Sequence, residues 1–372
     1  MYIARHRNTF CSRANKYNQI GISFVWTMHS TRLIFNHKLF FLIICQCTKL
    51  LTEKQCLWRD VIDIRWSSQY KNRLRCFVCT VKGEVVWGVT SLAGEIYLWR
   101  EKERDQVEVY DVITCRLQRC LTVPNIGGLS DMTSCEHCRC VYIGDGVFDC
   151  VHRLDVQGVV TRWAVNDKHF GLSVNTSHNV IVTCNVVRKI KEFSSHGELQ
   201  RQITFPDDVI HPWHTIQTQS GQFIVCHGYS DDPVHRVCMI SADGRHIVHS
   251  HGGQPGSDIG QYSMPIHLAV DDNEFVFVAD YINRRVTLLS PTLEYVSLVV
   301  SAEQLKWQPY ILHLDRQRHL YVVDNDWNEM QDRFTVGRVV VCSVWRTRML
   351  YYINVKNCRF ITMCKAHNWH IK

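Results

Sequence analysis

A short motif occurs twice in the C-terminal half, with its copies 44 residues apart, and it constrains the fold more than any other feature of the sequence. The two copies share a proline and two aspartates at identical spacings: Pro265, Asp271 and Asp280 in the first, and Pro309, Asp315 and Asp324 in the second. Apolar, alternating residues lie between these positions in both copies. A fixed period of this length indicates a repeat architecture, in which each unit forms one supersecondary element.

Earlier units can be found by marking the large apolar residue that opens each apolar strand: Tyr97, Tyr142, Ile181, Phe223, Phe277 and Tyr321. Their spacings of 45, 39, 42, 54 and 44 residues match one four-stranded propeller blade. In the best-preserved unit, strands are predicted at 266–271, 275–279, 285–289 and 295–300, separated by turn-forming residues. No segment shows sustained helical periodicity. The sequence therefore predicts an all-β, six-bladed propeller over residues 84–345.

The best unit also carries a family resemblance. The run from Phe277 to Val286 resembles the turn between the second and third strands of NHL repeats, where an aspartate ends one strand and an Asn-x-Arg pair opens the next. Asp280 and Arg285 hold those positions, and weaker copies surround Asp145 and Asp324. The resemblance implies an NHL-type propeller that binds its partner through loops.

Charge divides the chain at the same boundaries. Residues 1–83 contain 14 Lys or Arg against three Asp or Glu, and residues 346–372 contain six against none. Residues 84–345 contain 22 against 32, although the whole chain has a formal net charge of +7. We therefore expect basic N- and C-terminal extensions around an acidic propeller. Because backbone contacts to nucleic acid require clustered Lys and Arg, the acidic body disfavours RNA as the partner.

The N-terminal extension has one apolar run, at residues 39–45, which is far shorter than the roughly twenty residues that span a bilayer. It does not match a secretion signal either. Four cysteines in Val/Ile-rich runs are predicted to be small apolar core residues, which implies a reducing compartment: Cys184, Cys226, Cys238 and Cys342. We expect a cytoplasmic monomer without a membrane span.

Two other groups of cysteines have the spacing of half a zinc site. They are Cys76-x-x-Cys79 and the run from Cys135 to Cys140, which contains Cys138. A zinc finger needs a second pair some twelve to twenty residues further on, and neither group has one. The C-terminal Cys358, Cys364, His367 and His370 match no ligand pattern. No metal and no cofactor is therefore predicted.

Many NHL propellers end longer chains that begin with a RING domain and act in ubiquitin ligation. Residues 1–83 contain six cysteines without the ordered pairs of a RING. The resemblance thus implies the propeller half of a tripartite-motif-like protein without the RING, which could at most recruit substrates for ubiquitin ligation.

An enzymatic alternative rests on two histidines. His214 and His267 each lie two residues after a proline, where the repeat usually has glycine. Two imidazoles at the start of innermost strands could converge near the channel mouth and coordinate a divalent ion, with His211 or His313 as a third ligand. This would suit a metal-dependent lyase or hydrolase propeller. Histidines at such positions are more often packed or hydrogen-bonding residues, and no phosphate loop, nucleophile elbow or His-Glu-x-x-His motif is present.

The function predicted from the sequence is non-enzymatic recognition of a protein or peptide through loops at the channel mouth, with no catalytic residue. RNA binding through basic pairs near strand ends is the other alternative. The candidate binding residues are His214, His267, Arg284, Arg285, Asp280 and Asp324. Closure of the ring is predicted to use residues 334–344 as one strand, paired with residues 81–89 from the other end of the repeats.

Overall fold

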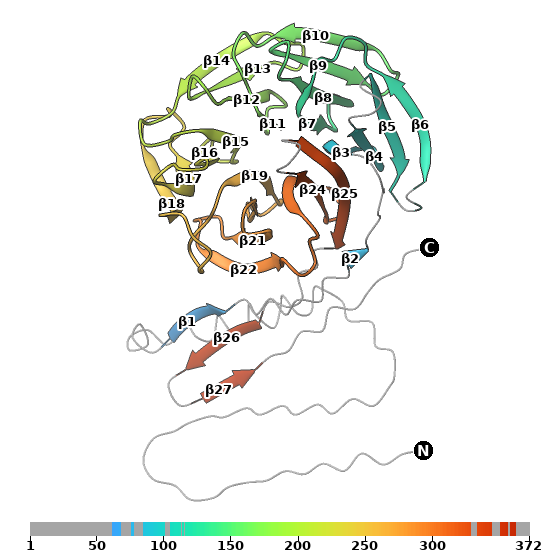
Figure 1. Cartoon of the computed structure of the whole chain (residues 1–372). Helices are drawn as coiled ribbons and strands as arrows, with labels where there is room; N and C mark the ends of the chain where they lie inside the picture. The colour runs from blue at the N-terminus through green and yellow to red at the C-terminus, as the bar shows by residue number, and fades with distance from the viewer. Residues whose placement is uncertain are drawn as a thin grey trace, which may run out of the picture. The chain divides into compact units, whose positions relative to one another are not determined.

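The computed structural model is a six-bladed β-propeller (Figure 1). It describes residues 85–100, 105–112, 114 and 116–328, and the backbone of strands at 62–67, 76–77, 333–343, 350–355 and 358–361; side chains are described to residue 326 and at 336–342. Each blade is a four-stranded antiparallel sheet, whose strands we call a to d from the channel outwards. The described part of the chain contains strands and turns but no helix, which confirms the predicted all-β class.

Strand bounds follow the chain in order. Blade 1 contains β3 (Val86–Leu92), β4 (Glu95–Arg100), β5 (Gln106–Asp111) and β6 (Leu117–Thr122). Blade 2 contains β7 (Leu129–Cys135), β8 (Cys140–Asp145), β9 (Cys150–Asp155) and β10 (Val160–Ala164). Blade 3 contains β11 (Gly171–Val174), β12 (Val180–Cys184), β13 (Lys189–Phe193) and β14 (Leu199–Thr204).

The second half continues in the same way. Blade 4 contains β15 (Pro212–Gln217), β16 (Phe223–His227), β17 (His235–Ile240) and β18 (Ile247–Gly253). Blade 5 contains β19 (Pro265–Val270), β20 (Val276–Asp280), β21 (Arg285–Leu289) and β22 (Tyr295–Val300), within one residue of the predicted bounds. Blade 6 contains β23 (Gln308–Leu314), β24 (His319–Asn328), β25 (Arg333–Ser343) and β2 (Cys76–Phe77).

Closure of the ring differs from the sequence-based expectation. β25 supplies the predicted C-terminal strand, but its partner is β2, with Cys76 opposite Cys342 and Phe77 opposite Val341. The predicted partner, residues 81–89, was wrong: Val86–Leu92 is the inner strand of blade 1, and residues 81–84 lie outside the described residues. The outermost strand d pairs with strand c alone. The two residues of β2, which precede the first repeat, are therefore enough to join the N-terminal part of the chain to blade 6.

The core lies between the blades. All six residues that marked the repeat lie on strand b of their blades and are fully buried: Tyr97, Tyr142, Ile181, Phe223, Phe277 and Tyr321. Each blade covers the apolar face of the next, so apolar clusters combine residues of adjacent blades. Cys184, Cys226 and Cys238, predicted to be apolar core residues, are buried free thiols, and Cys342 is buried as well.

The antiparallel order gives the ring two distinct faces. At one face of the ring, strands a and c start and strands b and d end. We call it the b–c face because it carries the turns from strand b to strand c. The turns from a to b and from c to d lie at the opposite face, which we call the a–b face. β1 (Ile62–Ser67), β26 (Leu350–Val355) and β27 (Cys358–Ile361) form a separate three-stranded sheet. Among the described residues, no helix is long and apolar enough to cross a membrane.

Candidate functional site

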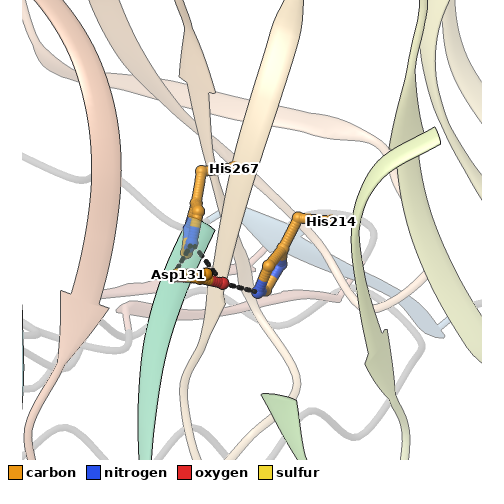
Figure 2. Close-up of side chains that lie close together, drawn as sticks. All are labelled: Asp131, His214 and His267. Atoms are coloured by element: carbon orange, nitrogen blue, oxygen red, sulfur yellow. Dashed lines mark hydrogen bonds and ion pairs between the residues drawn. The ribbon is translucent and has the colours of Figure 1, made fainter. Parts of the chain in front are cut away.

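One layer of the central channel contains a buried polar group made of Asp131, His214 and His267, which we call the channel group (Figure 2). The three residues come from β7, β15 and β19, the a strands of blades 2, 4 and 5. Each is the third residue of its strand and follows the same irregularity in the pairing with strand b. The predicted convergence of His214 and His267 is therefore confirmed, since their ring centroids are 3.9 Å apart.

The third member, Asp131, was missed, and neither suggested ligand takes its place. His211 is half exposed and pairs with Asp232 at 2.6 Å, whereas Nε2 of His313 bonds the Ser91 hydroxyl at 2.7 Å. The register of strand a could have identified Asp131, because it pairs with strand b as the two histidines do. The alignment relied on proline, and blade 2 has Leu129 at that position.

Most polar side-chain atoms of the channel group have a hydrogen-bond partner, and Nδ1 of His214 is the exception. Nε2 of His267 lies 3.3 Å from both carboxylate oxygens of Asp131, and Nε2 of His214 lies 3.6 Å from one of them. Asp131 also accepts the backbone N–H groups of Met132 and Leu172, both at 2.7 Å. Because Asp131 is only 1 % exposed, these donors compensate for the hydration that its carboxylate loses on burial.

Glycine in the neighbouring blade makes room for this arrangement. Gly171 occupies the position in blade 3 that corresponds to Asp131 and His214. A Cβ atom there would lie 2.5 Å from the Trp213 carbonyl oxygen and 2.9 Å from the His214 ring. Any larger residue would displace His214 from the channel, so glycine in blade 3 is required for the histidine in blade 4.

The electrostatics favour an ionised Asp131 and a neutral His214. Burial is the largest influence on Asp131 and would raise its pKa, but His267, His214 and the Leu172 N–H outweigh it, so the pKa lies below the usual range. Burial lowers the pKa of His214 to about 3, and His267 acts in the same direction. An ionised Asp131 therefore faces a neutral His214 at physiological pH.

Hydrogen positions decide whether a metal ion fits. Nδ1 of His267 accepts the backbone N–H of Leu312 at 3.3 Å, so the ring proton is on Nε2, which donates to Asp131. A neutral histidine that binds a metal through Nε2 must carry its proton on Nδ1. That proton would point at the Leu312 N–H group. The donor set of the channel group thus fits an internal network and does not fit a divalent ion.

The remaining acidic candidates stabilise the blades. Asp280 is fully buried and accepts Nε of Arg285 at 2.7 Å and the Ser263 N–H at 2.8 Å, and burial raises its pKa. Asp324 is equally buried, with Arg338 at 2.7 Å and the Lys306 N–H at 3.0 Å. These bonds join the b–c turn to the connection that enters the same blade. Asp280, Arg285 and Asp324 are thus occupied within the fold.

Blade 2 replaces that ion pair with a different set. Asp145 accepts four backbone N–H groups, from Gly127, Gly128, Val147 and Phe148. Burial would raise the pKa of Asp145, but these four donors lower it below its usual range. His152 lies 3.5 Å from the carboxylate, and burial lowers the pKa of the imidazole. Asp145 is therefore stabilised as an anion by the backbone.

Exposed apolar side chains gather on the b–c face. Eight of the twelve exposed large apolar residues described lie in its turns and connections: Val147, Phe148, Phe170, Val186, Val187, Tyr229, Ile259 and Ile282. Val147 and Phe148 are 56 % and 57 % exposed. Trp213, at the start of strand a in blade 4, contacts the rings of Phe170 and Tyr229 at 5.2 and 5.7 Å. We call these eight residues the apolar collar.

Basic residues near the same face are mostly paired with carboxylates. Six pairs are formed: Lys168–Asp149, Arg188–Asp207, Lys191–Asp167, Arg236–Asp208, Arg285–Asp280 and Arg338–Asp324. Arg284 is exposed on the b–c turn of blade 5, next to the collar residue Ile282. The predicted candidate Arg284 is thus exposed, whereas Arg285 is partly buried and paired with Asp280.

No protein-family model and no curated protein matches the sequence. Among solved structures, a streptogramin B lyase superposes with a TM-score of 0.51 at 9 % identity, covering 78 % of this chain and 97 % of that one. A catalytically inactive virginiamycin B lyase from Staphylococcus aureus, solved with quinupristin, also has a TM-score of 0.51 at 9 % identity, with 73 % of this chain and 99 % of that chain covered. Likeness at this identity shows the propeller fold alone.

Proposed function

We propose that the protein is a non-enzymatic scaffold that recognises a protein or peptide through its b–c face. The observation that supports this is the apolar collar, because a monomeric protein rarely leaves so many large apolar residues exposed together on one face without a partner. Tyr229 in the collar and Trp213 beside it are aromatic residues of the type that dominates the energetics of protein interfaces.

The charge pattern of the face favours protein over RNA. Backbone tracking of RNA needs cations that are available to phosphates, and six cations near this face are already paired with carboxylates. Asp207 is fully exposed and Asp208 largely so, which would repel a phosphate backbone. The exposed Arg284 would then serve as a polar contact at the rim of an apolar interface.

We propose further that the channel histidines catalyse no reaction. The channel histidines are buried and their Nε2 atoms are occupied, that of His267 by Asp131 and that of His214 by the Leu172 carbonyl oxygen, so they are not available to a substrate. In finer terms, we propose an NHL-type propeller in the cytoplasm, with substrate recruitment for ubiquitin ligation as the use to which such a scaffold would be put.

The test compares collar variants with matched surface variants of the full chain. Val147→Asp with Phe148→Asp places charge in the collar, whereas Leu117→Asp with Leu199→Asp places it on strand d, where exposure is similar at 50 % and 53 %. We expect affinity capture followed by mass spectrometry to recover the same proteins with wild type and the strand-d variant, and at least about tenfold less with the collar variant. Partners that are insensitive to the collar change, or that are released by nuclease, would refute the proposal.

A further inference from the structure

Blade 2 departs from the repeat at the residue opposite its buried aspartate. In blades 5 and 6 that residue is an arginine, which forms an ion pair with the aspartate at the b–c face: Arg285 with Asp280 and Arg338 with Asp324. In blade 2 the residue opposite Asp145 is Cys150. A cysteine thus occupies the position at which the two other blades have a cation.

Three potential metal ligands project to one side of blade 2. Asp145 and Cys150 are directly opposite each other on β8 and β9, and His152 follows Cys150 by two residues. Opposite residues share a face of a sheet, and so do residues two apart on one strand. Ile143 and Leu154 on the same side belong to the apolar cluster shared with blade 1. The three polar side chains therefore face the boundary between blades 1 and 2.

The ligand atoms of these residues are close enough to share one ion. Nε2 of His152 lies 3.5 Å from Oδ2 of Asp145 and 3.6 Å from Sγ of Cys150, and all three atoms are within 4.8 Å of one another. Around a tetrahedral zinc ion with usual bond lengths, a nitrogen ligand is about 3.4 Å from an oxygen ligand and about 3.6 Å from a sulfur ligand. The distances in blade 2 match both values.

The Asp145 carboxylate is held by the backbone in a way that leaves one oxygen available. Oδ1 accepts the N–H groups of Gly128, Val147 and Phe148. Oδ2 accepts only that of Gly127, at 2.8 Å. Because a carboxylate oxygen has two lone pairs, Oδ2 can bind an ion and keep this hydrogen bond. Ligating carboxylates are commonly oriented by such outer hydrogen bonds.

The His152 ring is free of the obstacle that excludes an ion from the channel group. Binding of zinc through Nε2 requires the ring proton to be on Nδ1. In the channel, Nδ1 of His267 accepts the Leu312 N–H, which prevents this. Nδ1 of His152 is buried and has no hydrogen-bond partner among the described residues, so no donor points at it. His152 can therefore carry its proton on Nδ1.

We propose that Asp145, Cys150 and His152 bind a zinc ion at the boundary between blades 1 and 2. The ion takes the place of the arginine in blades 5 and 6 as the cation beside the aspartate, and its binding releases the Cys150 thiol proton to solvent. Carboxylate, thiolate and imidazole are all usual zinc ligands, and a thiolate disfavours Mg²⁺ and Ca²⁺. Arg162, opposite His152 on β10, is exposed and forms no ion pair with Asp145 among the described contacts.

The proposed ion lies next to the turn that presents two residues of the apolar collar. Val147 and Phe148 both donate their backbone N–H groups to Asp145. Zinc would therefore stabilise the conformation of this turn. The site is nevertheless independent of the function proposed for the b–c face, because zinc binding is measured without any partner.

The repeat itself suggests variants that remove a ligand and keep the fold. Cys150→Arg gives blade 2 the residue that blades 5 and 6 have beside their aspartates, so it supplies a cation in place of the ion. His152→Val introduces the residue at the equivalent position of blade 6, Val340, which is buried there. Cys138→Ser is the control, because it removes a partly exposed thiol of the same blade outside the proposed site.

The experiment titrates the reduced, metal-free full-length protein with Co²⁺ and then Zn²⁺. We expect one equivalent of Co²⁺ to give a thiolate-to-cobalt charge-transfer band in wild type and in Cys138→Ser, and Zn²⁺ to displace it. Cys150→Arg should lack the band, and His152→Val should bind at least about tenfold more weakly, since even groups that only orient ligands contribute that much. Zn²⁺ should raise the melting temperature of wild type but not that of Cys150→Arg.

Two results would overturn the proposal. One is a wild-type chain that takes up neither ion. The other is a band of equal strength and affinity in wild type and in folded Cys150→Arg or His152→Val, which would assign the bound ion to other thiols of the chain. Thermal melts of the metal-free proteins show which variants are folded. Because each variant lacks a different ligand, either one that folds is sufficient for the test.

Discussion

The channel group and the contact between Cys135 and His178 at the a–b face both join a histidine to another blade, and they differ in how they are hydrogen-bonded. In the channel, the Nδ1 atom of His267 faces a backbone N–H, so the protonated Nε2 atom must donate to Asp131. At the a–b face, Nδ1 of His178 lies 3.7 Å from Sγ of Cys135, and this sulfur also accepts the N–H of Cys138 at 3.4 Å. Because a thiol is a weak hydrogen-bonding group, the channel group is the stronger of the two links between blades.

The two groups also differ in how many blades they join. Asp131 of blade 2 binds the N–H of Leu172 in blade 3, and His214 of blade 4 lies 3.0 Å from the carbonyl oxygen of the same residue. His267 of blade 5 accepts the N–H of Leu312 in blade 6. The channel group thus links five blades, whereas the contact between Cys135 and His178 links two. Changes in the channel should accordingly have the larger effect on stability.

The largest effect is expected for Asp131→Ala. The substitution leaves the N–H groups of Met132 and Leu172, and Nε2–H of His267, without an acceptor in a buried place. At about 1–3 kcal/mol for each unsatisfied donor, the free energy of unfolding should fall by about 3 kcal/mol or more. Urea denaturation measures this loss, with Asp155→Ala in an exposed turn of the same blade as the control. Equal losses in the two variants would contradict the assignment of the channel group as a structural link.

A smaller effect, which depends on pH, is expected from His214. Its pKa is about 3 in the folded protein against an ordinary value of 6.5, so the unfolded chain binds an extra proton between these values. The contribution of His214 to stability is therefore complete above pH 6.5 and is lost as the pH falls towards 3. Between pH 7 and pH 5, wild type should lose about 2 kcal/mol more than His214→Gln. Urea titrations at several pH values test this, and parallel pH profiles would show that His214 is not buried as a neutral ring.

The sequence predicted the strand pattern within each blade, but it did not predict the contacts that join one blade to another. The position of Phe277 and its equivalents depends on the local pattern of a strand, so all six were placed correctly. Asp131 escaped because blade 2 lacks the proline that marked the register. The closing strand Cys76–Phe77 is too short to carry a pattern, and its pairing depends on the ring as a whole. His178 contacts Cys135 only because consecutive blades bring equivalent turns together.

The smallest effect has the opposite sign and concerns the turn that carries His178. His178→Gly should raise the free energy of unfolding slightly, by up to about 1 kcal/mol, because the residue has a left-handed backbone that glycine adopts without strain. Arg318→Gly should give a similar gain for the same reason. Thermal melts of wild type and the two variants measure both gains. If His178→Gly were instead strongly destabilised, the contact of His178 with Cys135 and its stacking on His137 would be a stronger link between blades 2 and 3 than the comparison with the channel group implies.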